Sequence, residues 1–209
     1  KALSLGSGQN ASSSLNRRQR TELRLAWLLG LLAFSVYLLT LCPSVYPGDS
    51  AQAMAAVLGL VPAAAAHPVW QLACRAVAHL PLFELPFRLN LFSALCGAMA
   101  VATLFKLTSR LLYEFGHVDS STYSMLFYTY SREDAADQGA ERAKEGGAAE
   151  DTDYRAAILG GLVTALAFAF GAPFWSAAVS LHYQTFDLLL LFGTANALAN
   201  YIFKGNIIY

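Results

Sequence analysis

The sequence predicts an all-α, polytopic transmembrane protein, and three observations support this prediction. Hydrophobic residues make up 56% of the 209 residues, whereas only 13% are charged. A soluble domain carries about a quarter charged residues. The charges also gather before Leu25 and between Glu114 and Arg155. The rest of the chain therefore contains uncharged apolar runs, and several of them are long enough to cross a bilayer.

Composition also argues against several functions. The formal net charge is zero, which argues against a nucleic-acid partner bound through clustered Lys and Arg. No GxGxxG or Walker pattern is present, so a soluble nucleotide-dependent enzyme is not expected. The three cysteines, Cys42, Cys74 and Cys96, show no CxxC spacing. We interpret them as apolar side chains rather than zinc ligands or redox groups.

The first predicted span covers residues 25–42, which carry no charge. Residues 1–22 are rich in Ser, Gly and Asn and then basic, so we predict a disordered cytoplasmic tail. The arginines before the span belong in the cytoplasm by the positive-inside rule. A cleavable signal peptide is the competing interpretation, but the run is long for one and no small-x-small cleavage motif follows it.

An outer loop is predicted over residues 43–88. Asp49 and Ser50 can cap a short Ala-rich helix from Ala51 to about Leu60. Pro68 suits the first position of a second helix. In that helix apolar residues recur at helical spacing, which predicts a helix lying in the membrane interface. Its other face carries Gln71, Arg75 and His79.

Three further spans are predicted at 89–112, 156–172 and 174–203, with a mobile cytoplasmic loop at 114–155. Lys106 and Arg110 end the second span, where basic side chains reach cytoplasmic headgroups. Gly160 and Gly161 permit close helix packing in the third span. The fourth span begins with an unusually polar stretch, and polar groups in lipid are costly. These groups include Ser176, Ser180, His182, Tyr183, Gln184, Thr185 and Asp187.

Four spans place Asp49, His67 and His182 on the same, outer side of the membrane. From the residues alone Asp49 is explained as the cap of the next helix, a role that is compatible with catalysis, and His67 can be a loop residue bonded to backbone. His182 can be a satisfied polar group between helices. Asp187 lies deeper in the fourth span and is a candidate for structure or function equally.

Several motifs occur together in this order. They are Pro43 to Asp49, His67-Pro68, Arg88 to Leu95, and Phe174 to Val179. Their combination resembles the protein O-mannosyltransferase-like membrane family of the GT-C glycosyltransferase superfamily, catalogued in bacteria as a membrane domain of unknown function. The resemblance covers about residues 25–203 and extends the fold prediction to a GT-C-like architecture, with residues 23–209 as the N-terminal part of its transmembrane domain.

The resemblance implies an enzyme that moves a mannose-like sugar from a polyprenyl-phosphate donor to a protein Ser/Thr or another hydroxyl on the non-cytoplasmic face. Asp49 would be the catalytic base of an inverting transfer. His67 would orient Asp49 or contact the phosphate, and Arg75 or Arg88 would neutralise the leaving anion. Gln52 and His182 complete the expected substrate-binding residues. The membrane would be a bacterial inner membrane or the endoplasmic reticulum.

The chain departs from the family pattern at three places. Gln52 stands where the family tends to carry Glu, Val69-Trp70 replaces Pro-Gly, and His182-Tyr183-Gln184 replaces Glu-Val-Tyr. The resemblance leaves open whether a divalent cation takes part, and we assign no metal ligand. Two other functions stay open at this point: a transporter fragment with a polar path, and a non-catalytic membrane scaffold.

Overall fold

The computed structural model is helical throughout the residues it describes, which are 5–46, 48–61, 67–81, 83–128 and 139–205. No strand occurs in these ranges, so the predicted all-α class is confirmed. The helices are α1 (Leu5–Leu39), α2 (Asp49–Val57), α3 (Pro68–Ala78), α4 (Leu85–Tyr128), α5 (Gly139–Phe170), α6 (Ala172–Val179) and α7 (Tyr183–Gly205).

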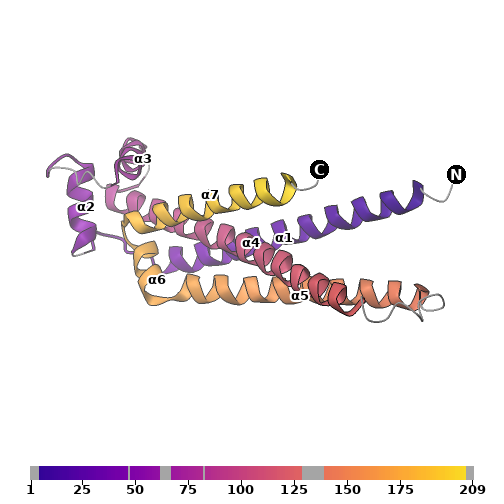
Figure 1. Cartoon of the computed structure of the whole chain (residues 1–209). Coiled ribbons are helices and arrows are strands. Elements are labelled where there is room, and N and C mark those ends of the chain that lie inside the picture. Colours follow the sequence, from indigo (N-terminus) through magenta and orange to yellow (C-terminus); the bar gives the residue numbers. More distant parts are fainter. Residues whose placement is uncertain (1–4, 47, 62–66, 82, 129–138, 206–209) are drawn as a thin grey trace.

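Four segments of these helices are long and apolar enough to cross a membrane, which confirms the predicted polytopic organisation. They belong to α1, α4, α5 and α7. Helix α4 is the central element, because it packs against α1, α5, α6, α7 and α3 (Figure 1). The spans are Arg18–Leu39, Leu85–Gly116, Thr152–Phe170 and Tyr183–Phe203.

Small side chains make up most of the core between α1, α4, α5 and α6. Without a hydrophobic driving force inside lipid, helices associate through close backbone approach, which small residues allow. At Gly161 an added Cβ would lie 2.9 Å from the Cβ of Ser109 and 3.1 Å from its backbone nitrogen. Tyr37 is completely buried in this core and donates to the carbonyl of Ala169 over 2.8 Å. The buried alanines are Ala26, Ala33, Ala94, Ala98, Ala100, Ala165, Ala169 and Ala178.

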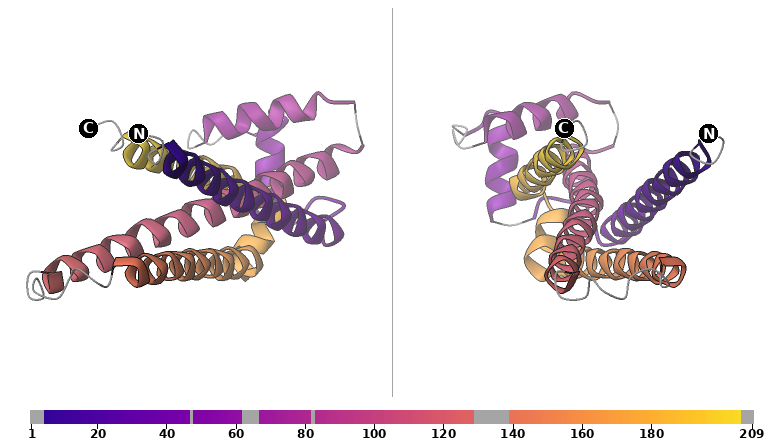
Figure 2. Two further views of the ribbon diagram at one scale, coloured as in Figure 1. Left: turned by 90° about the vertical axis from the view of Figure 1, so that its right-hand side faces the viewer. Right: turned by 45° about the vertical axis from the view of Figure 1, so that its right-hand side comes forward.

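The short helices lie at one end of the bundle and both chain termini lie at the other (Figure 1). Helices α2 and α6 run across the end of the long helices, and α3 lies beside α2. Toward its N-terminus α1 leans away from α4 and α5 (Figure 2). In the predicted topology the end with α2, α3 and α6 is the outer one, and we call it the outer end.

Helix α1 begins much earlier than we predicted. Residues 5–22, which we expected to form a disordered tail, continue the helix of the first span. Extending an existing helix avoids the cost of nucleation, and this segment contains no proline to stop it. The span-forming run therefore dictates the conformation of the polar residues before it. Residues 1–4 lie outside the described part of the chain.

Part of the segment predicted as a mobile loop, 114–155, is helical as well. Helix α4 continues to Tyr128 and α5 starts at Gly139. The segment lacks proline and is rich in Ala and Glu, which are strong helix formers. Residues 129–138 lie outside the described part of the chain.

The predicted fourth span, 174–203, is two helices rather than one. Helix α6 ends at Val179, Ser180 is extended (φ −130°, ψ 164°), and α7 starts at Tyr183. Backbone groups that lose their helical partners at this break are bonded elsewhere. Cys42 N–H donates to the carbonyl of Val179 over 3.0 Å. His182 N–H donates to Ser93 Oγ over 3.2 Å. The break therefore keeps its hydrogen bonds although it is largely buried.

Candidate functional site

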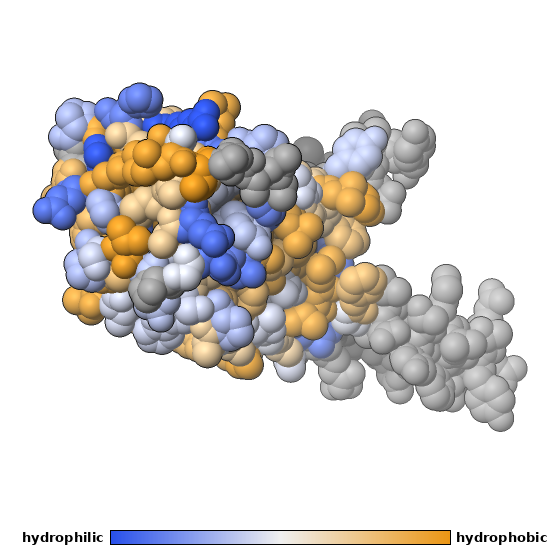
Figure 3. Space-filling view, turned by 90° about the vertical axis from the view of Figure 1, so that its left-hand side faces the viewer, coloured by the Kyte–Doolittle hydropathy of each residue, from blue (hydrophilic) through white to orange (hydrophobic). Residues whose placement is uncertain are grey.

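A polar cavity of about 570 Å³ lies at the outer end between α2, α3 and the break before α7. Small-molecule sites typically measure 300–1,000 Å³. Seen from this side, the surface combines hydrophilic and strongly hydrophobic regions (Figure 3). The lining residues come from three segments that are far apart in the sequence. They include Asp49 and Gln52 from α2, His67, Trp70 and Gln71 from the start of α3, and His182 and Tyr183 from the break.

Asp49 is exposed and occupies the first position of α2, not its cap. Gly48 is the capping residue, with φ at +95°, and among the described residues no side chain caps this helix. The cap explanation of Asp49 is therefore wrong, although a carboxylate in the first turn still favours the helix dipole. Asp49 also borders a second cavity, of about 370 Å³, beside Ser176, Ser180 and Gln184. Asp49 thus borders two cavities.

His67 is held by two contacts with α7. Its Nδ1 lies 2.8 Å from Oδ2 of Asp187. Its ring stacks on Tyr183, with centroids 3.9 Å apart and planes 19° from parallel. Because Nδ1 faces a carboxylate, it carries a proton, which leaves Nε2 for a ligand. His67 is the capping residue of α3, but its side chain caps nothing among the described residues.

His182 borders both cavities. The backbone N–H of Gln184 donates to its Nδ1 over 3.2 Å, so Nε2 carries the proton in the neutral ring. Burial lowers the pKa of His182, the carboxylate of Asp49 opposes this effect, and His67 adds to it. A neutral imidazole beside Asp49 can donate a hydrogen bond without adding charge.

One turn at the start of α4 fixes two of the three segments. Asn90 is completely buried and its amide donates to the carbonyls of Cys42 (2.8 Å) and Ser44 (3.1 Å). Ser93, one turn later, accepts from the backbone of His182. The loop that leads to Asp49 and the break that carries His182 are therefore tied to one rigid helix.

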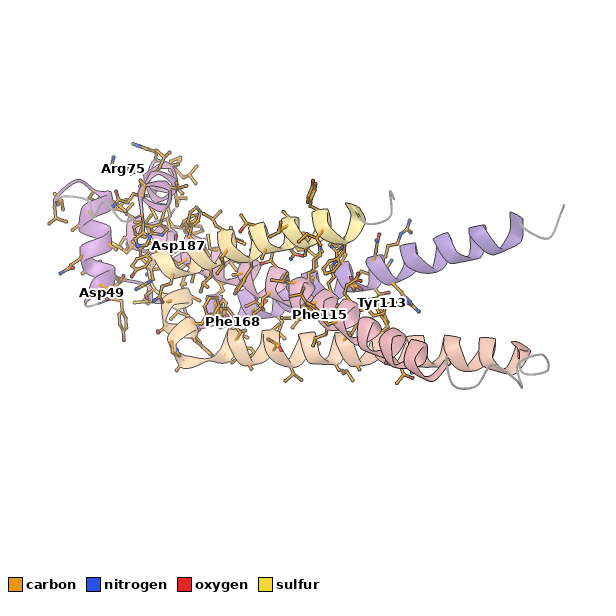
Figure 4. All side chains as sticks on the ribbon, viewed as in Figure 1. Asp49, Arg75, Tyr113, Phe115, Phe168 and Asp187 are labelled. Atoms are coloured by element: carbon orange, nitrogen blue, oxygen red, sulfur yellow. The ribbon has the colours of Figure 1, made fainter. Side chains whose placement is uncertain are left out.

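Arg75 and Arg88 do not face this cavity. They border a separate cavity of about 420 Å³, together with His79 and residues 57–59. Asp49 and Arg75 lie on different sides of the outer end, while Asp187 lies at the start of α7 (Figure 4). The predicted residues thus form two groups: Asp49, Gln52, His67 and His182 come together, and the two arginines do not join them.

An open apolar groove of about 400 Å³ borders the same site on the α7 side. Phe168, Phe174, Leu188 and Leu191 supply its apolar surface. Asp187, the partner of His67, and Gln184 lie in its wall. The groove is therefore linked to the polar cavity through the contact between His67 and Asp187.

The described residues show neither a metal site nor an activated thiol. No group of three or more His, Cys, Asp or Glu side chains in the described ranges is arranged to hold a metal ion. Burial raises the pKa of the Cys74 thiol to about 12, so this thiol stays protonated and unreactive. All three cysteines are free.

Sequence reasoning gave too little weight to Asp187 and Tyr183. Both belong to the polar stretch that opens the fourth span, where isolated polar groups are costly. That cost was the available signal, because a carboxylate at this depth requires a partner. Trp70, which the sequence analysis noted only as a departure from the family pattern, is 4% exposed and borders the cavity.

Together, fold and site define a polytopic helical membrane protein with a polar cavity at one end of the bundle. The sequence profile of the family described as "Protein O-mannosyl-transferase TMEM260 N-terminal domain" matches residues 51–193. The match covers more than half of the chain, and the chain belongs to this family. It confirms the predicted resemblance and favours a glycosyltransferase over a transporter or a scaffold.

The matched range starts two residues after Asp49 and includes His67, His182 and Asp187. No curated protein and no solved structure matches the chain.

Proposed function

We propose that the chain forms the donor-side site of an inverting GT-C-type glycosyltransferase. The enzyme transfers a mannose-like sugar from a polyprenyl phosphate to a protein hydroxyl on the non-cytoplasmic face. Family membership supports sugar transfer. The observation that carries the rest is the convergence of Asp49, His67 and His182 on one cavity beside an apolar groove. A lipid-linked sugar needs both environments, because its chain is apolar and its head is polar.

Asp49 acts as the general base in this proposal. Its carboxylate accepts the proton of the acceptor hydroxyl while that oxygen attacks the anomeric carbon of the sugar. The bond from this carbon to the phosphate oxygen breaks, and the phosphate leaves with the electron pair. Attack opposite the leaving group inverts the anomeric configuration. The exposure of Asp49 toward two cavities supports this role, because acceptor and donor must approach from different sides.

His67 is the proposed contact for the phosphate. Asp187 and the ring of Tyr183 fix its orientation, and its Nε2 is available on the imidazole edge opposite Asp187. In the protonated form His67 donates from Nε2 to a phosphate oxygen and stabilises the leaving anion. Arg75 and Arg88, which we expected in this role, border a different cavity.

A transfer assay with the full-length protein in membranes tests the proposal. Radiolabelled polyprenyl-phosphate mannose is the donor, and label in membrane protein is the readout. Asp49→Asn keeps the size of the side chain and removes the base, so we expect transfer to fall by about 10²- to 10⁴-fold. Glu84→Gln is the matched control, because Glu84 is an exposed acid at the outer end that does not border the cavity. We expect its transfer to equal that of the native protein.

Equal transfer by the native protein and Asp49→Asn would remove Asp49 from the chemistry. Absence of transfer by the native protein with several polyprenyl-phosphate sugars would refute the proposed donor class.

A further inference from the structure

Another polar cavity, of about 380 Å³, lies between the four long helices at the end of the bundle opposite to Asp49. Tyr113, which borders this cavity, lies at the opposite end of the bundle from Asp49 (Figure 4). Its lining carries three cations, Arg18, Lys106 and Arg110. Tyr113, Tyr154, Asn196 and Asn200 add hydroxyl and amide groups, and the carboxylates among its described lining residues are Glu22 and Glu114.

Among the described residues that line this cavity, cations outnumber carboxylates. Three cations and two carboxylates stand in a region that belongs to the spans of α1 and α4. Glu22 interacts electrostatically with Lys106, Arg110 and Arg18. Unneutralised charge near lipid is costly. An anionic ligand would lower this cost.

Some of these cations are already oriented by neighbours. Arg110 donates to Oδ1 of Asn200 and lies 5.2 Å from the ring centre of Phe203. Arg18 donates to the hydroxyl of Tyr113 over 3.2 Å. The ammonium group of Lys106, in contrast, makes no side-chain hydrogen bond within the described part of the chain, although it interacts electrostatically with Glu22. Its ammonium group is thus available to an oxygen ligand.

An exposed apolar stripe on α1 continues from the cavity toward the outer end. Leu23 borders the cavity, and Trp27 and Leu31 follow at intervals of four residues on the same face. Their exposed fractions are 47%, 66% and 65%. A ligand with an anionic head and apolar tails matches a charged cavity that opens onto such a stripe.

We propose that this cavity binds the phosphodiester head group of an anionic phospholipid, with its acyl chains along the α1 stripe. The basic residues place this end on the cytoplasmic side by the positive-inside rule, and the cytoplasmic leaflet is the one that carries anionic lipid. The site is independent of the proposed transfer reaction. Its occupancy stabilises the packing of α1 against α4.

Thermal unfolding of the purified full chain in detergent tests this proposal, with added phosphatidylglycerol or phosphatidylcholine as probes. Both lipids contain a phosphodiester, but only phosphatidylglycerol has a net charge. We expect phosphatidylglycerol to raise the midpoint and phosphatidylcholine to leave it nearly unchanged. Lys106→Gln should weaken the apparent affinity for phosphatidylglycerol about fivefold, whereas Lys106→Arg should retain it.

Arg24→Gln is the control, because Arg24 is an exposed cation of α1 that does not border the cavity. Equal weakening by Arg24→Gln and Lys106→Gln would show a general surface effect and overturn the site. Equal stabilisation by both lipids would also overturn it. If inorganic phosphate stabilises the protein as much as phosphatidylglycerol does, the ligand of this site is a free anion and the lipid proposal is overturned. If Lys106→Gln does not fold, Arg110→Gln takes its place in the same comparison.

Discussion

Individual side chains explain why this outer cavity is polar without being a metal site. Two histidines border it, and each has one ring nitrogen committed to a partner. Nδ1 of His67 faces Asp187, and Nδ1 of His182 accepts from the backbone of Gln184. Both rings therefore keep Nε2 for a ligand. In the neutral rings Nε2 of His67 is an acceptor and Nε2 of His182 is a donor, and both are oriented before a substrate arrives.

The lowered pKa of His182 predicts a pH dependence of stability. In the unfolded chain His titrates near 6.5, and in the folded chain burial lowers that pKa. The folded state then binds fewer protons than the unfolded state in the interval below about 6.5. The contribution of His182 to stability is complete above that pH, and it is lost as the pH falls through the lowered pKa.

The measurement is the thermal midpoint of the native protein and of His182→Gln, from about pH 7.5 to about pH 5.5. Glutamine keeps an acceptor for the Gln184 backbone but does not titrate. We expect the native midpoint to fall more steeply toward acid than that of His182→Gln. The variant His79→Gln, at an exposed histidine outside the cavity, should follow the native curve. Parallel curves for all three proteins would contradict the prediction.

At the scale of helices, the packing of α4 against α5 depends on backbone contact at Gly161. The added methyl group of Gly161→Ala would meet the backbone and Cβ of Ser109 at 2.9–3.2 Å. Neither can move without moving α4. Overpacking of this kind costs about 1–3 kcal/mol. We therefore expect Gly161→Ala to lower the thermal midpoint by several degrees.

Gly193→Ala is the matched control on another span. An added Cβ at Gly193 meets no described atom within 4 Å. Alanine also favours a helix over glycine by up to about 1 kcal/mol, so this variant should be neutral or more stable. Equal midpoints for the two variants would show that the close contact at Gly161 contributes nothing.

The helices show how far sequence reasoning reached. Uncharged runs predicted the four spans. Burying a charge in lipid is costly, so membrane-spanning segments exclude charged residues and can be recognised from the sequence alone. The break at residues 180–182 was not predicted. No proline or glycine marks it, and it is stabilised by Ser93 and Cys42 from distant parts of the chain. Local sequence does not contain such partners.

For the site as well, some features were predictable from the sequence and others depend on three-dimensional packing. Asp49, His67 and His182 were predicted to share one side of the membrane, and this follows from counting spans. Which residues actually face one cavity depends on how each short helix is rotated. Arg75 follows Gln71 by one turn on α3, yet the two border different cavities. The contact of His67 with Asp187 likewise needs the three-dimensional packing of α3 against α7.

For the molecule as a whole, the bundle predicts a defined orientation. The outer end carries α2 and α3, and the other end carries both termini. Four spans put the start of α1 and the end of α7 on the same membrane face, and the positive-inside rule predicts that this face is the cytoplasmic one. Leu60→Cys, next to α2, and Phe115→Cys, at the end of a span, report the two faces; both positions are exposed.

Each cysteine is introduced into a Cys42→Ser background, since Cys74 and Cys96 are buried. In sealed membranes with the non-cytoplasmic face outward, an impermeant maleimide should label Leu60→Cys directly. Phe115→Cys should react only after permeabilisation. The background without an added cysteine measures unspecific labelling. Reaction of both variants from the same side would refute the four-span topology.

The turn of α4 with Asn90 and Ser93 has a consequence for protein design. Neither residue borders the cavity, yet together they position the segments that carry Asp49 and His182. A designer who grafted only the cavity-lining residues onto another helical scaffold would obtain the right chemical groups on two untethered loops. The smallest transferable unit therefore includes this turn, with its amide and hydroxyl facing the same two segments.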